Sequence, residues 1–149
     1  MAKWLNGWRK LSWPTRVRTG GLVLMLVPVH ASLFAIGYVR TRHWLERLST
    51  APNPRPPSPF DLTEACRFAE LASIAGRHGL VDATCLRQSL LVHFLLRRKG
   101  MVPKLMLGVR RQGSEMDAHA WVQLGDMALG QPELAHTALP SHDLQRQTR

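Results

Sequence analysis

The chain has 149 residues, 45% of them hydrophobic, which is long and apolar enough for one domain with a buried core. Its two cysteines, Cys66 and Cys85, are too few for a disulfide framework and lack the spacing of a structural zinc site, so a reduced, cytoplasmic setting is expected. The net charge of +10 suggests an anionic partner, but no RNA-binding signature with interleaved aromatic residues accompanies it, so no nucleic acid is expected.

The first 50 residues hold most of the positive charge, with eight Lys or Arg against one acidic residue, Glu46. Residues 20–39 contain no Lys, Arg, Asp or Glu, and arginines and tryptophans flank them. This pattern predicts either a membrane-spanning helix or a helix, kinked at Pro28, that packs on the rest of the protein. Hydropathy alone leaves the two alternatives open, and the charge also allows contact with an anionic membrane surface.

Prolines dominate the next segment, with five between Pro52 and Pro59. Proline at this density cannot continue a helix and favours an extended, stiff connection. We therefore expect three parts: a basic, tryptophan-rich helical segment over residues 1–50, a linker over residues 51–60 and a domain over residues 61–149.

The pattern becomes helical from Asp61, which can act as the N-cap of a helix that stops at Gly79. Glu64 follows three residues later, as in a capping box. Cys66 belongs to the apolar stripe of this helix, so we expect it to be buried there with no chemical role.

A second helix is predicted to begin near residues 82–84, where Asp82 or Thr84 can supply the N-cap oxygen. The segment is apolar over most of its circumference, which is typical of a central, buried helix. Basic residues close it, as the helix dipole favours, and Gly100 ends it.

After Gly100 the apolar period becomes that of strands, with glycines in the turns. Three strands are predicted, over residues 102–111, 117–124 and 127–131. Two helices followed by an antiparallel meander predict an α+β domain. The last dozen residues, 138–149, are expected to form a polar tail.

Cys85 falls in the first turn of the second predicted helix, and this position has two interpretations. Unpaired backbone N–H groups and the helix dipole stabilise a thiolate there, as a cysteine nucleophile requires. The N–H of Cys85 can also donate to an oxyanion. The alternative is a small buried hydrophobic side chain, and position alone does not decide between them.

A cysteine nucleophile needs a base, and His119 is the strongest candidate among the seven histidines. It lies in mid-strand between two alanines, which leave room for a substrate. Trp121 lies on the same face of the strand and can shield the imidazole from water in the substrate pocket. His93 is a weaker candidate, because it lies two turns along the helix of Cys85, roughly 12 Å away.

A base is usually oriented by a third group. If the hairpin after His119 turns through residues 124–126, Gln131 lies directly across from His119 and its Oε1 can accept a hydrogen bond from the ring. Asp126, in the turn, is the alternative third member and is expected to be solvated. Gln131 can equally be an ordinary polar residue at a strand end.

The motifs "CLRQSLL…LLRRKG", "LGV" and "AHAWV", in this order, resemble the protease of lasso-peptide biosynthesis, the B protein. That family is a transglutaminase-like member of the papain-type cysteine hydrolases. The resemblance covers residues 61–139. The segment before it also resembles the tryptophan- and arginine-rich lead-in of these proteins, which favours a packed or membrane-surface helix over a spanning one.

The resemblance implies a leader peptidase with a papain- or transglutaminase-like core, in which a central helix packs on an antiparallel sheet. The family's nucleophile falls on Cys85 and its general base on His119. Its third member is usually an aspartate, and Gln131 occupies that position here. A neutral amide can still orient an imidazole, as asparagine does in papain-like enzymes. No cofactor and no metal ion are implied.

The resemblance also implies partners: the precursor peptide with its leader, and the family's ATP-dependent lasso cyclase. The family uses a small leader-binding domain, and nothing before Asp61 resembles it, so a separate leader-binding protein is expected.

Two other functions stay open. One is a transglutaminase-like acyl transferase, in which an amine captures the thioester. The other is a non-catalytic membrane- or peptide-binding adaptor, in which Cys85 and His119 are structural.

Overall fold

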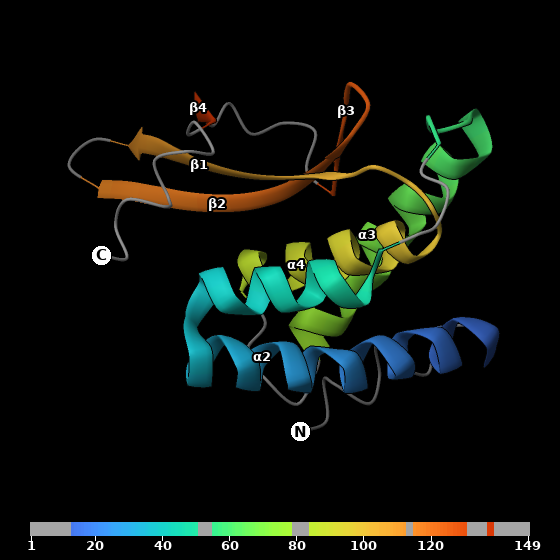
Figure 1. Ribbon diagram of the computed structural model, residues 1–149, viewed down its shortest axis with the longest axis horizontal. Helices are drawn as coiled ribbons and strands as arrows, with labels where there is room; N and C mark the ends of the chain where they lie inside the picture. The colour runs from blue at the N-terminus through green and yellow to red at the C-terminus, as the bar shows by residue number, and fades with distance from the viewer. Residues whose placement is uncertain (1–12, 51–54, 79–83, 113–114, 131–136, 139–149) are drawn as a thin grey trace.

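The computed structural model describes residues 13–50, 55–78, 84–112, 115–130 and 137–138. They form three layers, with one long helix on one side, two helices in the middle and an antiparallel sheet on the other side (Figure 1). The helices are α2 (Trp13–Leu48), α3 (Pro59–His78) and α4 (Cys85–Arg98). The strands are β1 (Lys104–Gln112), β2 (Glu115–Leu124), β3 (Met127–Leu129) and β4 (Thr137–Ala138), in the sheet order β3-β2-β1-β4. The predicted α+β class is confirmed.

The long helix α2 reverses direction at Gly37, where φ is 75° and ψ is 175°. The chain then turns back, so that residues 13–36 and 38–48 form two arms (Figure 1). The backbone departs from helical angles at Gly37 and not at Pro28, where a kink was predicted. The bend falls at Gly37 because a residue without a Cβ adopts this positive φ without strain.

One face of α2 packs on the two middle helices. Leu22 and Leu26 lie in a buried cluster with Leu71 of α3 and Leu91 of α4. Further along, the second arm contributes Leu45 to a cluster around α4. By length and composition α2 could cross a membrane, yet this face is buried within the protein.

The start of α3 is a capping box built on Ser58. The Ser58 hydroxyl and N–H both donate to the Asp61 carboxylate, at 2.7 and 2.8 Å, and the Asp61 N–H points back to the Ser58 Oγ at 3.3 Å. Asp61 was predicted as the N-cap, which is wrong: the helix begins at Pro59, whose fixed φ suits the first helical position. Arg55 also donates to both carboxylate oxygens, and these bonds hold the pKa of Asp61 well below its usual range.

The predicted capping role of Glu64 is also wrong, because its carboxylate accepts a hydrogen bond from Lys99 Nζ at 2.7 Å. This ion pair links α3 to the end of α4. The predicted linker is shorter than expected on its C-terminal side, since Pro59 and Phe60 already belong to α3. Gly79 and Asp82 lie outside the described residues.

The central helix α4 has the boundaries that the sequence predicts, with Thr84 as N-cap and Gly100 after the end. Gly100 has a φ of 83°, and its N–H and that of Met101 donate to Arg97 and Leu96 carbonyls in the pattern of a Schellman motif. Most of the helix from residue 89 to 96 is buried between α2, α3 and the sheet. It is therefore the central, buried helix that was predicted.

The sheet covers α3 and α4 with the inner face of β2. Ala120, Val122 and Leu124 are buried there, and Val122 and Leu124 belong to the main core cluster with residues of α3 and α4. The strands β1, β2 and β3 form the predicted meander. The strand β4 was not predicted: it pairs with the other edge of β1 and includes Ala138, which was assigned to the polar tail. Residues 139–149 lie outside the described part of the chain.

Candidate active site

Cys85 occupies the first position of α4, as predicted, and its side chain is half-buried. The Thr84 side chain, predicted as a cap, makes no capping hydrogen bond. The N–H groups of Arg87 and Gln88 donate to the Thr84 carbonyl. Because a helix has no acceptor for its first N–H groups, those of Cys85 and Leu86 are available to a negatively charged atom at this end.

A cavity of about 380 Å³ brings Cys85 and His119 together. Its walls come from α3, α4 and β2, and from the end of β3 with the residue after it. Besides these two residues, it is lined by Ala69 and Ser73 of α3, by Gln88, Ser89 and Val92 of α4, by Ala120, Trp121 and Val122 of β2, and by Leu129 and Gly130. The cavity therefore joins the predicted nucleophile and the predicted base, which are far apart in the sequence.

The cavity lies beside β2, past the last described pair between β2 and β3. The pairs between β2 and β3 end with Val122 and Leu129, so β3 does not cover the strand at Ala120. The Ala120 carbonyl instead accepts a hydrogen bond of 2.9 Å from the Ser89 hydroxyl. Ser89 lies one turn after Cys85, so this bond holds the helix of the cysteine to the strand of the histidine.

His119 and Trp121 lie on the same face of β2, as the two-residue period predicts. Their rings are stacked, with centroids 6.2 Å apart and an interplanar angle of 14°. Both side chains are half-buried and both line the cavity. They alternate with the buried Ala120 and Val122, and the cavity is lined by residues of both faces of the strand.

The predicted hairpin register is wrong by one residue. In the structure Leu124 pairs with Met127, so the turn has two residues, Gly125 and Asp126, instead of three. Gly125 has a φ of 60°, and glycine at the first central position is typical of a tight two-residue hairpin turn. The argument that placed Gln131 directly across from His119 therefore fails.

The third member of the site stays a prediction. Gln131 lies outside the described residues, but Gly130, the residue before it, lines the cavity. Asp126, the alternative, is exposed in the turn, and the described lining of the cavity does not include it.

The weaker candidates lie elsewhere. His93, a residue of α4, is only 4% exposed, and the described lining of the cavity does not include it. Burial lowers the pKa of His93 to about 4, with a further contribution from the cationic Arg97. Cys66 was predicted to be buried, but its side chain is only half-buried. Its Sγ lies 3.6 Å from the Met127 sulfur, and the side chain packs against the core.

Two residues of the cavity were missed in the sequence. Gln88 and Ser89 lie three and four positions after Cys85, on the turn of α4 that follows it. The available signal was a pair of adjacent polar residues one turn before the apolar middle of the helix. A second cavity, of about 450 Å³, contains no predicted catalytic residue and lies beside Arg18, Arg67 and Phe68. Among the described residues, no cluster of His, Cys, Asp and Glu is arranged to hold a metal ion.

A family model for the transglutaminase-like superfamily matches residues 23–139, which is most of the chain. The chain belongs to the transglutaminase-like superfamily. Members of this superfamily are generally cysteine proteases or acyltransferases, and the fold predicted from the sequence agrees with it. A search of the curated proteins and a search of the solved structures found no match.

The transglutaminase-like region includes Cys85, His119 and Gln131. It begins inside α2, before the predicted linker, and α2 packs on α3 and α4. The division of the chain at residues 51–60 stays a prediction.

Proposed function

We propose that this transglutaminase-like chain is a cysteine peptidase that removes the leader from a ribosomally made lasso precursor peptide. The observation that carries the proposal is the shared cavity, into which α4 brings Cys85 and β2 brings His119. The resemblance of the motifs around both residues to the lasso B proteins narrows the chemistry from acyl transfer in general to leader hydrolysis.

The first half of the reaction forms a thioester. His119 takes the proton from the Cys85 thiol, and the thiolate attacks the carbonyl carbon of the last leader residue. The N–H groups at the start of α4 stabilise the oxyanion of the tetrahedral intermediate. The intermediate collapses as the C–N bond breaks, and the imidazolium of His119 protonates the leaving amine of the core peptide.

The second half releases the leader. His119 deprotonates a water molecule, which attacks the thioester carbonyl, and the thiol of Cys85 is restored as the leader leaves with a free carboxylate. The chemistry consumes water and needs neither a nucleotide nor a metal ion. Trp121, stacked beside His119, limits the access of bulk water to the imidazole.

The proposal includes the expected partners. A separate leader-binding protein delivers the precursor, and the amine freed by cleavage is then joined to a side-chain carboxyl by an ATP-dependent cyclase. The cavity has walls from α3, α4 and β2, and an extended peptide segment binds in it beside Cys85 and His119.

The test is cleavage of a precursor peptide by the purified full chain with its leader-binding partner, followed by mass spectrometry. Cys85→Ala should abolish cleavage, because it removes the covalent route. Cys66→Ala is the matched control and should retain activity, because Cys66 packs against the core away from the cavity. Circular dichroism of both variants verifies the fold.

The products separate the proposal from its competitors. Hydrolysis yields a leader with a free carboxylate, whereas an acyl transferase yields a leader joined to an amine. Normal cleavage by folded Cys85→Ala would instead support the adaptor. Loss of activity in Cys66→Ala alone would mean that the wrong cysteine was assigned.

A further inference from the structure

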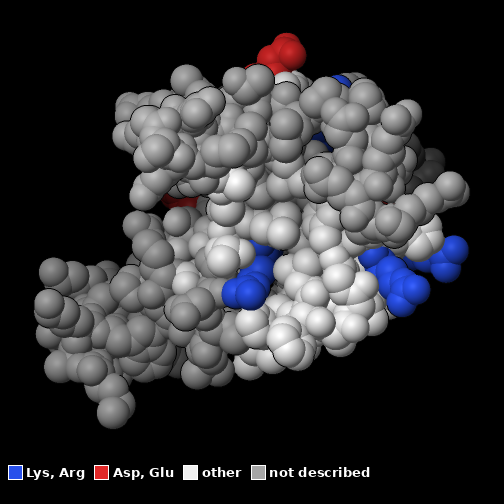
Figure 2. All heavy atoms as spheres, turned by 90° about the vertical axis from the view of Figure 1, so that its left-hand side faces the viewer, with Lys and Arg blue, Asp and Glu red and all other residues white. Residues whose placement is uncertain are grey.

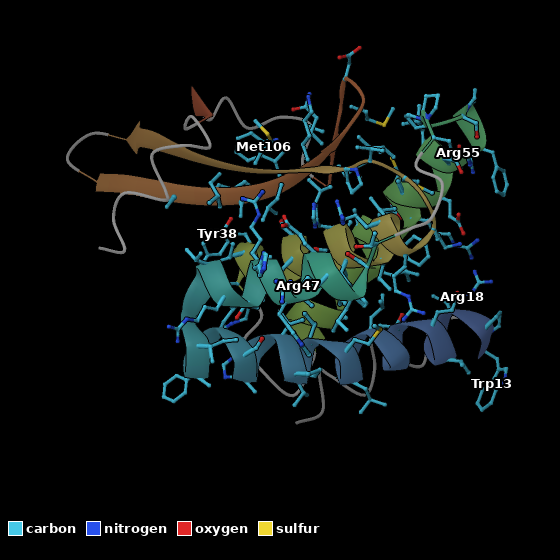
Figure 3. All side chains as sticks on the ribbon, viewed as in Figure 1. Trp13, Arg18, Tyr38, Arg47, Arg55 and Met106 are labelled. Atoms are coloured by element: carbon cyan, nitrogen blue, oxygen red, sulfur yellow. The ribbon has the colours of Figure 1, made fainter. Side chains whose placement is uncertain are left out.

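The first arm of α2 carries a continuous apolar face that nothing in the described structure covers. We call it the outer stripe; it consists of Trp13, Val17, Leu24, Val27, Ala31 and Phe34. These positions follow one another at intervals of three, four or seven residues, so they lie on one side of the helix. Phe34 is 90% exposed, Trp13 75% and Leu24 68%. Trp13 points away from the rest of the protein (Figure 3).

The outer stripe is long and lies on the outermost of the described layers (Figure 1). From Trp13 to Phe34 the helix extends about 32 Å at the usual rise per residue. Figure 1 shows this arm as the outermost layer, with α3, α4 and the sheet all on its other side. A face of this shape fits a flat, extended partner and does not form a groove for a peptide.

A spanning orientation conflicts with the packing of α2. Its inner face, with Leu22 and Leu26, is buried against α3 and α4, so those helices would have to enter the bilayer with it. α3 carries the exposed Arg67 and Glu70, and α4 ends in the exposed Arg98. Charged side chains are strongly disfavoured in hydrocarbon, whereas a helix lying flat keeps all three in water.

The charge of α2 selects the kind of surface. Arg18, Arg40 and Arg47 are exposed, but none belongs to the outer stripe: Arg18 faces α3, where it lines a cavity with Arg67 and Phe68, and Arg40 and Arg47 lie on the second arm (Figure 3). Glu46, the one acidic residue of the first 50, is paired with Arg42 at 2.9 Å. On the lower half of the face in Figure 2, which includes the bend of α2, the described side chains show Lys and Arg but no Asp or Glu. This field attracts an anionic surface.

We propose that α2 lies flat on an anionic phospholipid membrane, with the outer stripe inserted at the boundary between headgroups and acyl chains. The net positive charge of residues 1–50 supplies a long-range attraction to lipid phosphates. The cavity with Cys85 and His119 lies in the layer beyond α3 and α4, on the side away from the lipid, so it stays open to a peptide from the aqueous phase (Figure 1). This inference does not depend on the proposed reaction.

The experiment is co-flotation of the full chain with vesicles of phosphatidylcholine and phosphatidylglycerol, compared with phosphatidylcholine alone. The protein should float with the anionic vesicles, and added salt should weaken the binding. The double variant Leu24→Ser/Phe34→Ser should bind about tenfold more weakly or worse, because two large apolar side chains are lost from the lipid-facing side.

Phe60→Ser is the matched control, because Phe60 is 76% exposed at the start of α3 but lies outside the outer stripe. It should bind like the wild type. Equal binding by the double variant and the control would overturn the proposal, as would equal binding to neutral vesicles. A protein that stays in the membrane after alkaline carbonate extraction would show a spanning helix and overturn it too. Failure to float at low salt, with the outer stripe captured by the leader-binding protein instead, would assign the face to that protein.

Discussion

The Ser89 hydroxyl donates a 2.9 Å hydrogen bond to the carbonyl of Ala120. Ser89 belongs to the helix that begins at Cys85, and Ala120 follows His119 in β2. Both partners are buried, so the bond lies in a low-dielectric environment where its geometry matters. It is a direct link between the two elements that carry the proposed nucleophile and base.

Ser89→Ala should therefore impair catalysis more than it impairs peptide binding. The variant leaves a buried carbonyl without its donor, which should lower the free energy of unfolding by about 1–3 kcal/mol. The helix and the strand can then shift relative to each other, and a displacement of the order of 1 Å between reacting groups costs up to about a hundredfold in rate. Steady-state cleavage kinetics and urea unfolding measure the two effects. Ser73→Ala, which removes a hydroxyl from the part of the cavity wall that α3 forms, is the control and should keep near-normal kcat.

Gly76→Ala should reduce activity without a matching loss of stability. A methyl group at Gly76 in α3 would overlap the side-chain amide of Gln88, which lines the cavity. The flexible amide must move, while alanine in a helix is favoured over glycine by up to about 1 kcal/mol. We expect slower cleavage at an unchanged or higher Tm. The double variant Gly76→Ala/Gln88→Ala should behave like Gln88→Ala alone; if it is slower than Gln88→Ala, the overlap is not the cause.

Gln131→Ala should lower kcat by about tenfold or more and change KM less, because an orienting group acts on the imidazole and not on peptide binding. Gln131→Asp, which restores the residue usual in the lasso B proteins, should keep or raise kcat, because a carboxylate also stabilises the imidazolium. Asp126→Ala should match the wild type, since Asp126 is exposed in the turn. An inactive Asp126→Ala protein beside two normal Gln131 variants would assign the role to Asp126.

The buried His93 should make the protein less stable in acid. Burial lowers the pKa of His93 from 6.5 to about 4. The positive charges of Arg97 and Arg42 also lower this pKa, whereas Glu46 and a hydrogen bond to the Pro103 backbone act against the shift. Between these values the unfolded chain binds more protons than the folded one, so stability falls as pH drops from about 6.5 to about 4 and is retained above 6.5. The loss is at most about 3 kcal/mol.

Urea unfolding at pH 7 and at pH 4.5 measures this effect. His93→Gln should show a smaller decrease between the two pH values than the wild type, whatever its stability at pH 7. The same decrease in both proteins would mean that His93 is not the group responsible.

Local patterns in the sequence were enough to predict the kinds of element and several of their ends. The position of Cys85 in the first turn of α4 and the stop at Gly100 depend on the backbone groups of one short segment, so local rules decide them. The shared face of His119 and Trp121 follows from the period of a strand. The capping box of α3 was misplaced by three residues because Ser58, Asp61 and Glu64 offer two overlapping patterns of the same kind.

The sequence by itself determined which segments are helical or extended and that Cys85 lies at a helix start. Only the tertiary structure decided that Cys85 and His119 share a cavity, that Ser89 bonds to Ala120, and that the hairpin turns through two residues. It also decided which face of α2 is buried. An apolar helix has no polar side to indicate its orientation, and contacts between distant segments depend on how whole elements pack, which no local period encodes.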